Sequence, residues 1–164
     1  MIKSKINTSQ QRFENVVPIT IILVAALIIL YFFLRPVKIV STVREWNQGY
    51  FFVDNFPMTA KARIAWWEEN KEVLKEKYNM PFIGTDKRWR VLIGEAGEGF
   101  QFLPKTDKAD DYLCFDSLKP GANCAEKKWL LWISHYNQTD TSYTTDDSEY
   151  IQRGENAEIK RVAD

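Results

Sequence analysis

The chain has 164 residues, of which 45% are hydrophobic and 14% aromatic, and it carries 22 basic and 22 acidic residues. This length predicts one folded domain plus any membrane segment, and the hydrophobic content excludes a largely disordered chain. Residues 1–35 hold four of the basic residues and one of the acidic ones, so residues 36–164 have a net charge of −3. Such a mildly acidic domain is not expected to bind nucleic acid, because phosphates attract basic surfaces.

An apolar run near the N-terminus predicts a membrane anchor. Residues 1–15 are polar and without periodicity, and we expect a disordered tail there. Residues 16–34 read VVPITIILVAALIILYFFL and contain no charge. As a helix with about 1.5 Å per residue, this run spans roughly 28 Å, close to the hydrocarbon thickness of a bilayer. Arg35 and Pro36 then provide a charged stop and a helix terminator, so residues 16–35 predict one transmembrane helix that binds the lipid bilayer.

A cleaved signal peptide is the alternative interpretation of this run. Its hydrophobic region is shorter and ends in small residues at an A-x-A-like cleavage site. The run in this chain ends in YFFLRPVK, which offers no such residue. The sequence therefore favours an uncleaved anchor.

The cysteines, rather than the charges, indicate on which side of the bilayer residues 36–164 lie. Three basic residues precede the run and three follow it closely, so the positive-inside rule gives no orientation. Cys114 and Cys124 are the only cysteines, with Pro120 and Gly121 between them to turn the chain. A pair with none left over favours a disulfide in an oxidising compartment, whereas two reduced, buried cysteines of a cytosolic domain are the alternative. We therefore expect residues 36–164 outside the cytoplasm and the N-terminal tail inside it.

The strongest element expected in the domain is one amphipathic helix. Strand-like runs at 37–43 and 50–53 come first and predict a hairpin. Thr59 is then placed to cap a helix from about Ala60 to Asn79. Four apolar residues recur on one stripe of this helix while charged residues cover the rest of it. The stripe consists of Ile64, Trp67, Leu74 and Tyr78.

Short strand-like runs separated by turn residues follow the helix. They lie at 89–93, 100–103, 112–115, 129–134, 142–145, 149–151 and 158–162. Their spacing is typical of an antiparallel meander. We therefore expect an α+β domain over 36–164, with the one helix packed on an antiparallel sheet.

No set of residues predicts catalysis, a cofactor or a metal site. The glycine-rich segment 94–99 lacks the Lys-Ser or Lys-Thr pair of a phosphate loop, and a hairpin loop is expected there. His135 is the only histidine, and its neighbour Ser134 would point to the opposite face of a strand, so we expect His135 to be exposed at a strand end. The acidic clusters at 107–111 and 146–149 lack the ligand spacing of a calcium loop.

Trp66 is the candidate binding residue. Neighbours on a helix diverge by about 100°, so Trp66 and Trp67 cannot both point to the centre of one face. Trp67 lies on the apolar stripe and Trp66 lies beside it. Trp66 therefore either widens the buried stripe or is left to anchor a partner, since tryptophan is enriched at binding hot spots.

Several stretches together resemble a known family. After the anchor come LRPVKIV, NFPMTAKARIAWWEENKEVLKEKYNMP, DYLCFDSLKPGANCAEK and DDSEY. They resemble the enterobacterial membrane proteins of unknown function that are grouped as domain-of-unknown-function family 943, from the anchor to Tyr150. The resemblance implies a Gram-negative inner-membrane protein with a periplasmic domain, and it supplies no catalytic residues.

The sequence thus predicts an inner-membrane-anchored periplasmic binding module and not an enzyme. The resemblance also associates the chain with variable loci beside secreted toxins, where small neighbours act as immunity proteins. A toxin that the domain binds and neutralises is therefore the first expected partner. A structural or assembly factor of an envelope complex is the alternative, and a hydrolase with an unrecognised site is the second alternative.

Overall fold

The computed structural model describes residues 20–28, 31, 35–80, 87–136 and 139–162. The chain divides into two compact units, Met1–Pro36 and Val37–Asp164. In the first unit residues 20–28 are helical, and no helix within the described ranges is long and apolar enough to cross a membrane. The predicted tail at 1–15 and part of the predicted anchor at 16–35 lie outside the described residues.

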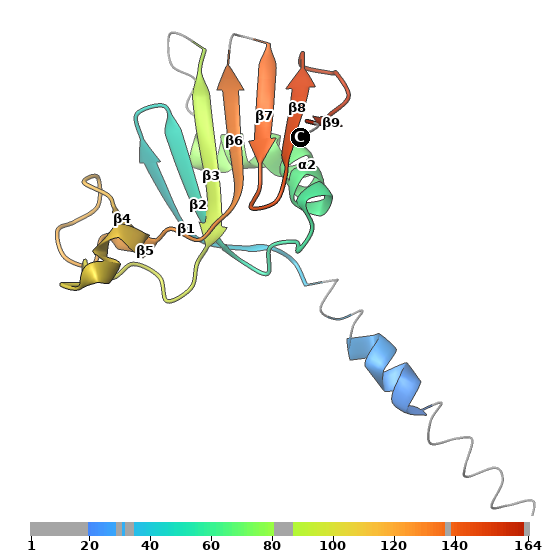
Figure 1. Cartoon of the computed structure of the whole chain (residues 1–164), viewed down its shortest axis with the longest axis horizontal. Coiled ribbons are helices and arrows are strands. Elements are labelled where there is room, and N and C mark those ends of the chain that lie inside the picture. The colour runs from blue at the N-terminus through green and yellow to red at the C-terminus, as the bar shows by residue number, and fades with distance from the viewer. Residues whose placement is uncertain (1–19, 29–30, 32–34, 81–86, 137–138, 163–164) are drawn as a thin grey trace, which may run out of the picture. The chain divides into compact units, whose positions relative to one another are not determined.

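The second unit is built on a seven-stranded sheet in the order β1-β2-β3-β6-β7-β8-β9 (Figure 1). The strands of this sheet are β1 (Lys38–Glu45), β2 (Gln48–Asp54), β3 (Trp89–Glu95), β6 (Trp129–Tyr136), β7 (Asp140–Thr144), β8 (Glu149–Arg153) and β9 (Lys160–Arg161). A separate ribbon pairs β4 (Tyr112–Cys114) with β5 (Cys124–Glu126), and the 3-10 helix η1 (Asp107–Asp111) precedes it. The predicted α+β class is confirmed.

The expectation of a wholly antiparallel sheet is wrong at one pair. β2 and β3 run parallel, whereas every other strand pair of the described sheet is antiparallel. Parallel neighbours cannot be joined by a tight turn and need a crossover, and the helix α2 (Ala60–Tyr78) lies between β2 and β3 in the sequence. The amphipathic helix therefore sets the topology as well as covering the sheet.

The predicted helix and its cap are confirmed. The Thr59 hydroxyl accepts a hydrogen bond from the Ala62 N–H at 3.3 Å, which satisfies one of the free donors of the first turn. At the other end Asn79 adopts a left-handed conformation with φ 52°, as a residue after a helix commonly does. Ile64, Trp67 and Leu74 of the predicted stripe are buried.

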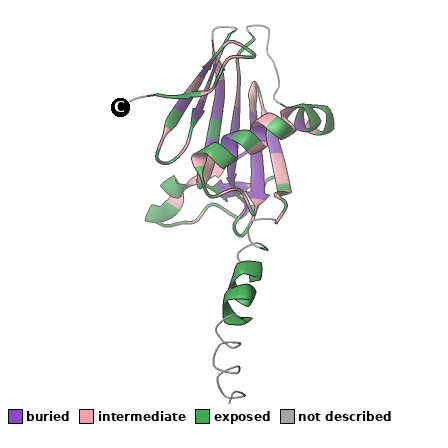
Figure 2. Cartoon of the chain, turned by 90° about the vertical axis from the view of Figure 1, so that its right-hand side faces the viewer, coloured by how far each residue is buried: buried purple, intermediate pink, exposed green. Residues whose placement is uncertain are grey.

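Both faces of the central strands are covered. One core cluster joins the buried face of α2 to alternate residues of the sheet, among them Phe51, Val53 and Ile133. The other faces of the same strands join the β4–β5 ribbon in a second cluster, which includes Phe52 and Phe115. Figures 1 and 2 show α2 across one face of the sheet. The domain thus has a helical side and a ribbon side.

The segment between β3 and β6 differs from the sequence-based expectation. The antiparallel partner of β3 is β6, so the glycine-rich segment 94–99 is not a hairpin loop, although Gly97 and Gly99 do have positive φ. The predicted strand at 100–103 is absent, and only Gln101 forms an isolated bridge, with Cys124. Phe100 packs instead against the second core cluster, which ties this segment to the ribbon side of the sheet.

Candidate functional site

A cleft of about 520 Å³ lies on the helical side of the described part of the domain. One flank of α2 forms one wall, and β3, β6, β7 and β8 form the other. Because β3 begins at Trp89 and pairs there with His135 near the end of β6, the cleft lies at the end of the sheet where β3 starts. The lining residues are Trp67, Glu68, Lys71, Glu72, Lys75, Lys87, Trp89, His135, Thr139, Thr141, Tyr143, Gln152, Gly154 and Glu155.

Tyr143 forms the polar floor of this cleft. Its hydroxyl lies 2.8 Å from Oε1 of Glu68 and 3.2 Å from Oε1 of Gln152. The Gln152 amide donates to the Ala157 carbonyl at 3.0 Å, which orients its oxygen toward Tyr143. One phenolic proton therefore serves two acceptor oxygens, and the floor is rich in acceptors.

The electrostatics of the floor make Tyr143 a hydrogen-bond donor and not a base. Burial, and then the hydrogen bond to the Glu68 carboxylate, raise the pKa of Tyr143 far above its ordinary value. The phenol is therefore protonated at any physiological pH. The other oxygen of Glu68 forms an ion pair with Lys71 at 2.6 Å, which joins helix and floor in one fixed network.

An aromatic stack forms the sheet wall of the cleft. The rings of Trp89 and His135 lie 5.4 Å apart and nearly parallel, with an interplanar angle of 7°. Nδ1 of His135 lies 2.9 Å from the Thr141 hydroxyl. The expectation of an exposed histidine is therefore wrong, since His135 is half-buried, and its sequence neighbour Ser134 is buried.

The rim of the cleft carries balanced charge. Lys71, Lys75 and Lys87 contribute three positive charges, which Glu68, Glu72 and Glu155 offset. Lys75, Glu72 and Lys87 are exposed. A surface of this kind, with an aromatic wall and charged groups of both signs, suits a polar partner better than an apolar ligand.

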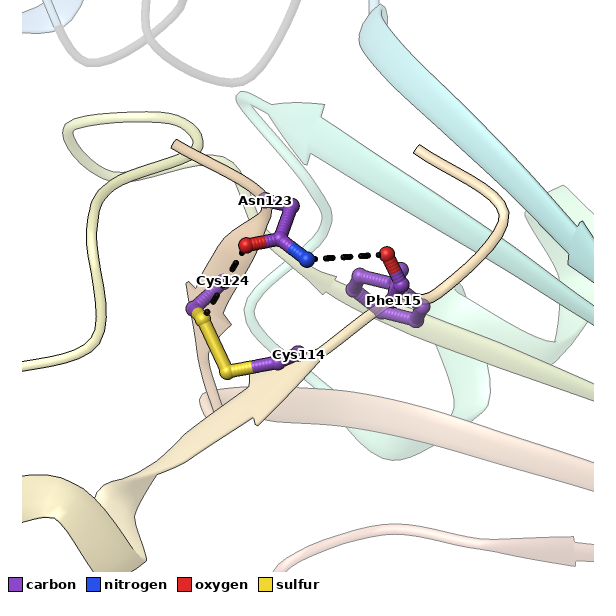
Figure 3. Close-up of a disulfide and its surroundings, with 4 residues drawn as sticks. All are labelled: Cys114, Phe115, Asn123 and Cys124. Atoms are coloured by element: carbon purple, nitrogen blue, oxygen red, sulfur yellow. Dashed lines mark hydrogen bonds between the residues drawn. A yellow bond between two sulfur atoms is a disulfide. The ribbon is translucent and has the colours of Figure 1, made fainter. Parts of the chain in front are cut away.

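The two cysteines form the disulfide that the sequence predicts. Cys114 and Cys124 lie opposite each other in the β4–β5 ribbon, with an S–S distance of 2.02 Å (Figure 3). Beside them the Asn123 amide donates to the Phe115 carbonyl at 3.1 Å, and the Phe115 side chain is fully buried in the second core cluster. The bridge therefore joins the two strands of the ribbon, and the packing of Phe115 holds the ribbon on the sheet. A structural disulfide is typical of domains outside the cytoplasm.

A comparison with models of protein families identifies the family of this chain. A model described as "Enterobacterial putative membrane protein (DUF943)" matches residues 10–163. The chain belongs to this family. No curated protein and no solved structure matches the chain.

Trp66, the sequence-based candidate for binding in this DUF943 member, lies away from the cleft. Its ring is half-buried and meets the Phe56 ring edge-on, with centroids 5.3 Å apart. Trp67, by contrast, is only 1% exposed and reaches the cleft from its floor. With about 100° between successive residues, Trp66 points to the flank of α2 opposite Lys71 and Lys75. Helix α2 thus offers two separate candidate surfaces.

The acidic cluster at 146–149 has structural partners. Asp146 accepts a hydrogen bond from the buried Arg63 guanidinium at 2.9 Å, which ties the β7–β8 turn to α2. Hydrogen bonds from Ser148 and then Thr145 lower the pKa of Asp147 below its ordinary value. Among the described residues, no group of three or more side chains is arranged to hold a metal ion.

The cleft is what sequence reasoning missed. Tyr143 and Gln152 lie on the neighbouring strands β7 and β8 and are nine residues apart in sequence. Glu68 is 75 residues away from Tyr143. The only local signal is the spacing of Lys71 and Lys75 beside the Trp67 stripe. That α2, β7 and β8 line one cleft can be seen only when the strand order is known.

Proposed function

We propose that the chain is a binding module of the bacterial envelope. Residues 16–35 anchor it in the inner membrane as a single pass, and the folded domain stands in the periplasm. Its task is to bind and neutralise a secreted toxin. The family of membrane proteins and the disulfide support the location. Anchoring suits the task because it concentrates the domain where a toxin that attacks the membrane or wall must act.

The observation that carries the binding role is the preformed cleft. Its floor is fixed by the Glu68–Tyr143–Gln152 network, so a partner would find its acceptor oxygens already in place. Its rim offers lysines and glutamates that can pair with charged side chains of a partner, while the Trp89–His135 stack offers an aromatic surface. A loop of a protein with basic and acidic side chains fits this surface.

The test compares two lysines of the last turn of α2. Lys75 lines the cleft, and Lys77 belongs to the same turn but is not among the lining residues. Both substitutions put a negative charge in the last turn of the helix, so they are matched for their effect on the helix dipole. We expect Lys75→Glu to weaken partner binding at least about tenfold, a cost of about 1.4 kcal/mol, and Lys77→Glu to leave it unchanged.

The measurement uses the full chain in its own membrane. Cells that produce the wild type or one variant are challenged with the toxin encoded beside the gene, and the complex is purified from detergent-solubilised membranes. Survival and co-purification should both fall with Lys75→Glu alone. Equal effects of the two substitutions would remove the cleft from the proposal. A resident envelope protein in place of the toxin would favour the alternative role, an assembly factor.

A hydrolase is the second alternative, and the contact between His135 and Thr141 is the observation that favours it. A histidine beside a hydroxyl can in principle activate it as a nucleophile. Thr141→Val removes the hydroxyl and keeps the shape of the side chain. Toxin protection that survives this substitution speaks for binding, whereas complete loss with intact binding speaks for hydrolysis.

A further inference from the structure

The start of β1 and the ends of β2 and β3 lie at one end of the seven-stranded sheet. Lys38 pairs with Asp54, and Val53 pairs with Glu95, so these strand ends lie at the same edge. We call it the proximal end, and the opposite edge, where β3 starts, the distal end. Figure 1 shows the loops that follow β2 and β3 leaving the sheet at the proximal end. The candidate cleft lies at the distal end.

The loops at the proximal end expose large apolar side chains. Met58, in the segment after β2, is 87% exposed. Phe102 and Leu103, in the segment after β3, are 72% and 49% exposed. Met58 lies on the helical side and Phe102 on the ribbon side, in segments that both follow strands ending at this edge. Exposed apolar side chains on both sides of one edge, in a domain that buries two core clusters, are available to an apolar partner.

Hydrogen bonds hold both loops in place beside these side chains. The Arg63 Nε donates to the Pro57 carbonyl at 2.9 Å, next to Met58. Gln101 exchanges two backbone hydrogen bonds with Cys124, at 2.8 and 3.0 Å, next to Phe102. The apolar side chains are therefore presented by fixed backbone.

The sequence places an apolar partner at this edge. The uncharged run ends at Leu34, and Val37 already packs against the first core cluster. Three residue steps span at most about 10 Å, even in a fully extended chain. A bilayer that holds the run therefore lies next to the start of β1, and with it the proximal end.

We propose that the proximal end rests on the bilayer surface, with Met58, Phe102 and Leu103 in the headgroup region of the lipid. The inference rests on the anchored topology proposed above and adds an orientation to it. Apolar side chains are stabilised at the membrane interface because their surface is removed from water there. Because the distal end lies the length of β3 away, roughly 20 Å, the cleft then opens away from the membrane and toward an incoming partner.

The test is site-specific photocrosslinking of the full chain in nanodiscs of phosphatidylethanolamine and phosphatidylglycerol. Benzoylphenylalanine replaces one residue at a time: Met58, Phe102, Trp46 or Ile22. Trp46 is the matched control, because it is 92% exposed but lies in the turn between β1 and β2 at the distal end. Ile22 lies in the apolar run and reports on the anchor itself.

We expect lipid adducts at positions 22, 58 and 102, with yields at 58 and 102 several-fold above the yield at 46. Adducts at 22, with yields at 58 and 102 no higher than at 46, would overturn the inference and leave the anchor standing. Adducts of 58 and 102 with a protein would overturn it as well, since the edge would then be a protein interface. No adduct at 22 would overturn both the anchor and the orientation.

Discussion

Replacing Trp67 with alanine is expected to lower the free energy of unfolding by about 3–5 kcal/mol, as truncation of a core tryptophan does. The side chain is 1% exposed and belongs to the core cluster between α2 and the sheet. Its ring meets the Trp89 ring with centroids 6.2 Å apart, so the substitution opens a cavity under the cleft. Urea unfolding of the purified chain in detergent measures the loss.

Trp66→Ala is the matched control for this substitution. Trp66 is half-buried and contacts Phe56 at the border of the same cluster, so its truncation should cost clearly less stability. If both substitutions unfold the domain alike, Trp66 belongs to the core and has no claim to bind a partner. If Trp66 is instead an anchor, its loss should weaken partner binding by 2 kcal/mol or more, roughly thirtyfold.

Loss of the disulfide is expected to have the second largest effect. Replacing both Cys114 and Cys124 with serine should lower the free energy of unfolding by about 3 kcal/mol, because the bridge closes a short loop in the unfolded chain. The effect should appear first at the β4–β5 ribbon, where Phe115 packs edge-on against Tyr50 with centroids 4.9 Å apart. Hydrogen exchange of the ribbon amides locates the loss.

The oxidation state of the natural chain provides the control for the serine variant. Protein isolated from the envelope without reductant should have a mass two hydrogen atoms below that of the reduced form. Reduction of the wild type should then reproduce the stability of the serine variant. Two thiols that alkylate freely in the folded protein would contradict the bridge and, with it, the extracytoplasmic location.

Local chemistry explains which elements could be predicted. The Thr59 cap, the apolar spacing of Ile64 and Trp67 and the turn after Asn79 act within a few residues, so the helix followed from the sequence. The cysteine pair followed because no third cysteine competes for it. In each case the partner groups are close in sequence or without alternatives.

Strand order and the cleft depend on contacts that are distant in sequence. The parallel pairing of β2 with β3 and the pairing of β3 with β6 leave no signal in the strands themselves, since apolar strands suit several neighbours. The Glu68–Tyr143 contact exists only because this order places β7 under α2. The burial of His135 is not predictable from its neighbours for the same reason, because its stacking partner Trp89 lies 46 positions earlier.

The location of the domain is the claim on which the binding role rests, and a topology reporter tests it most directly. Alkaline phosphatase, which is active only outside the cytoplasm, and a fluorescent protein, which is active only inside it, are each fused after Asp164 of the full chain. We expect high phosphatase activity and no fluorescence. Fluorescence without phosphatase activity would place the domain in the cytoplasm and contradict the periplasmic location.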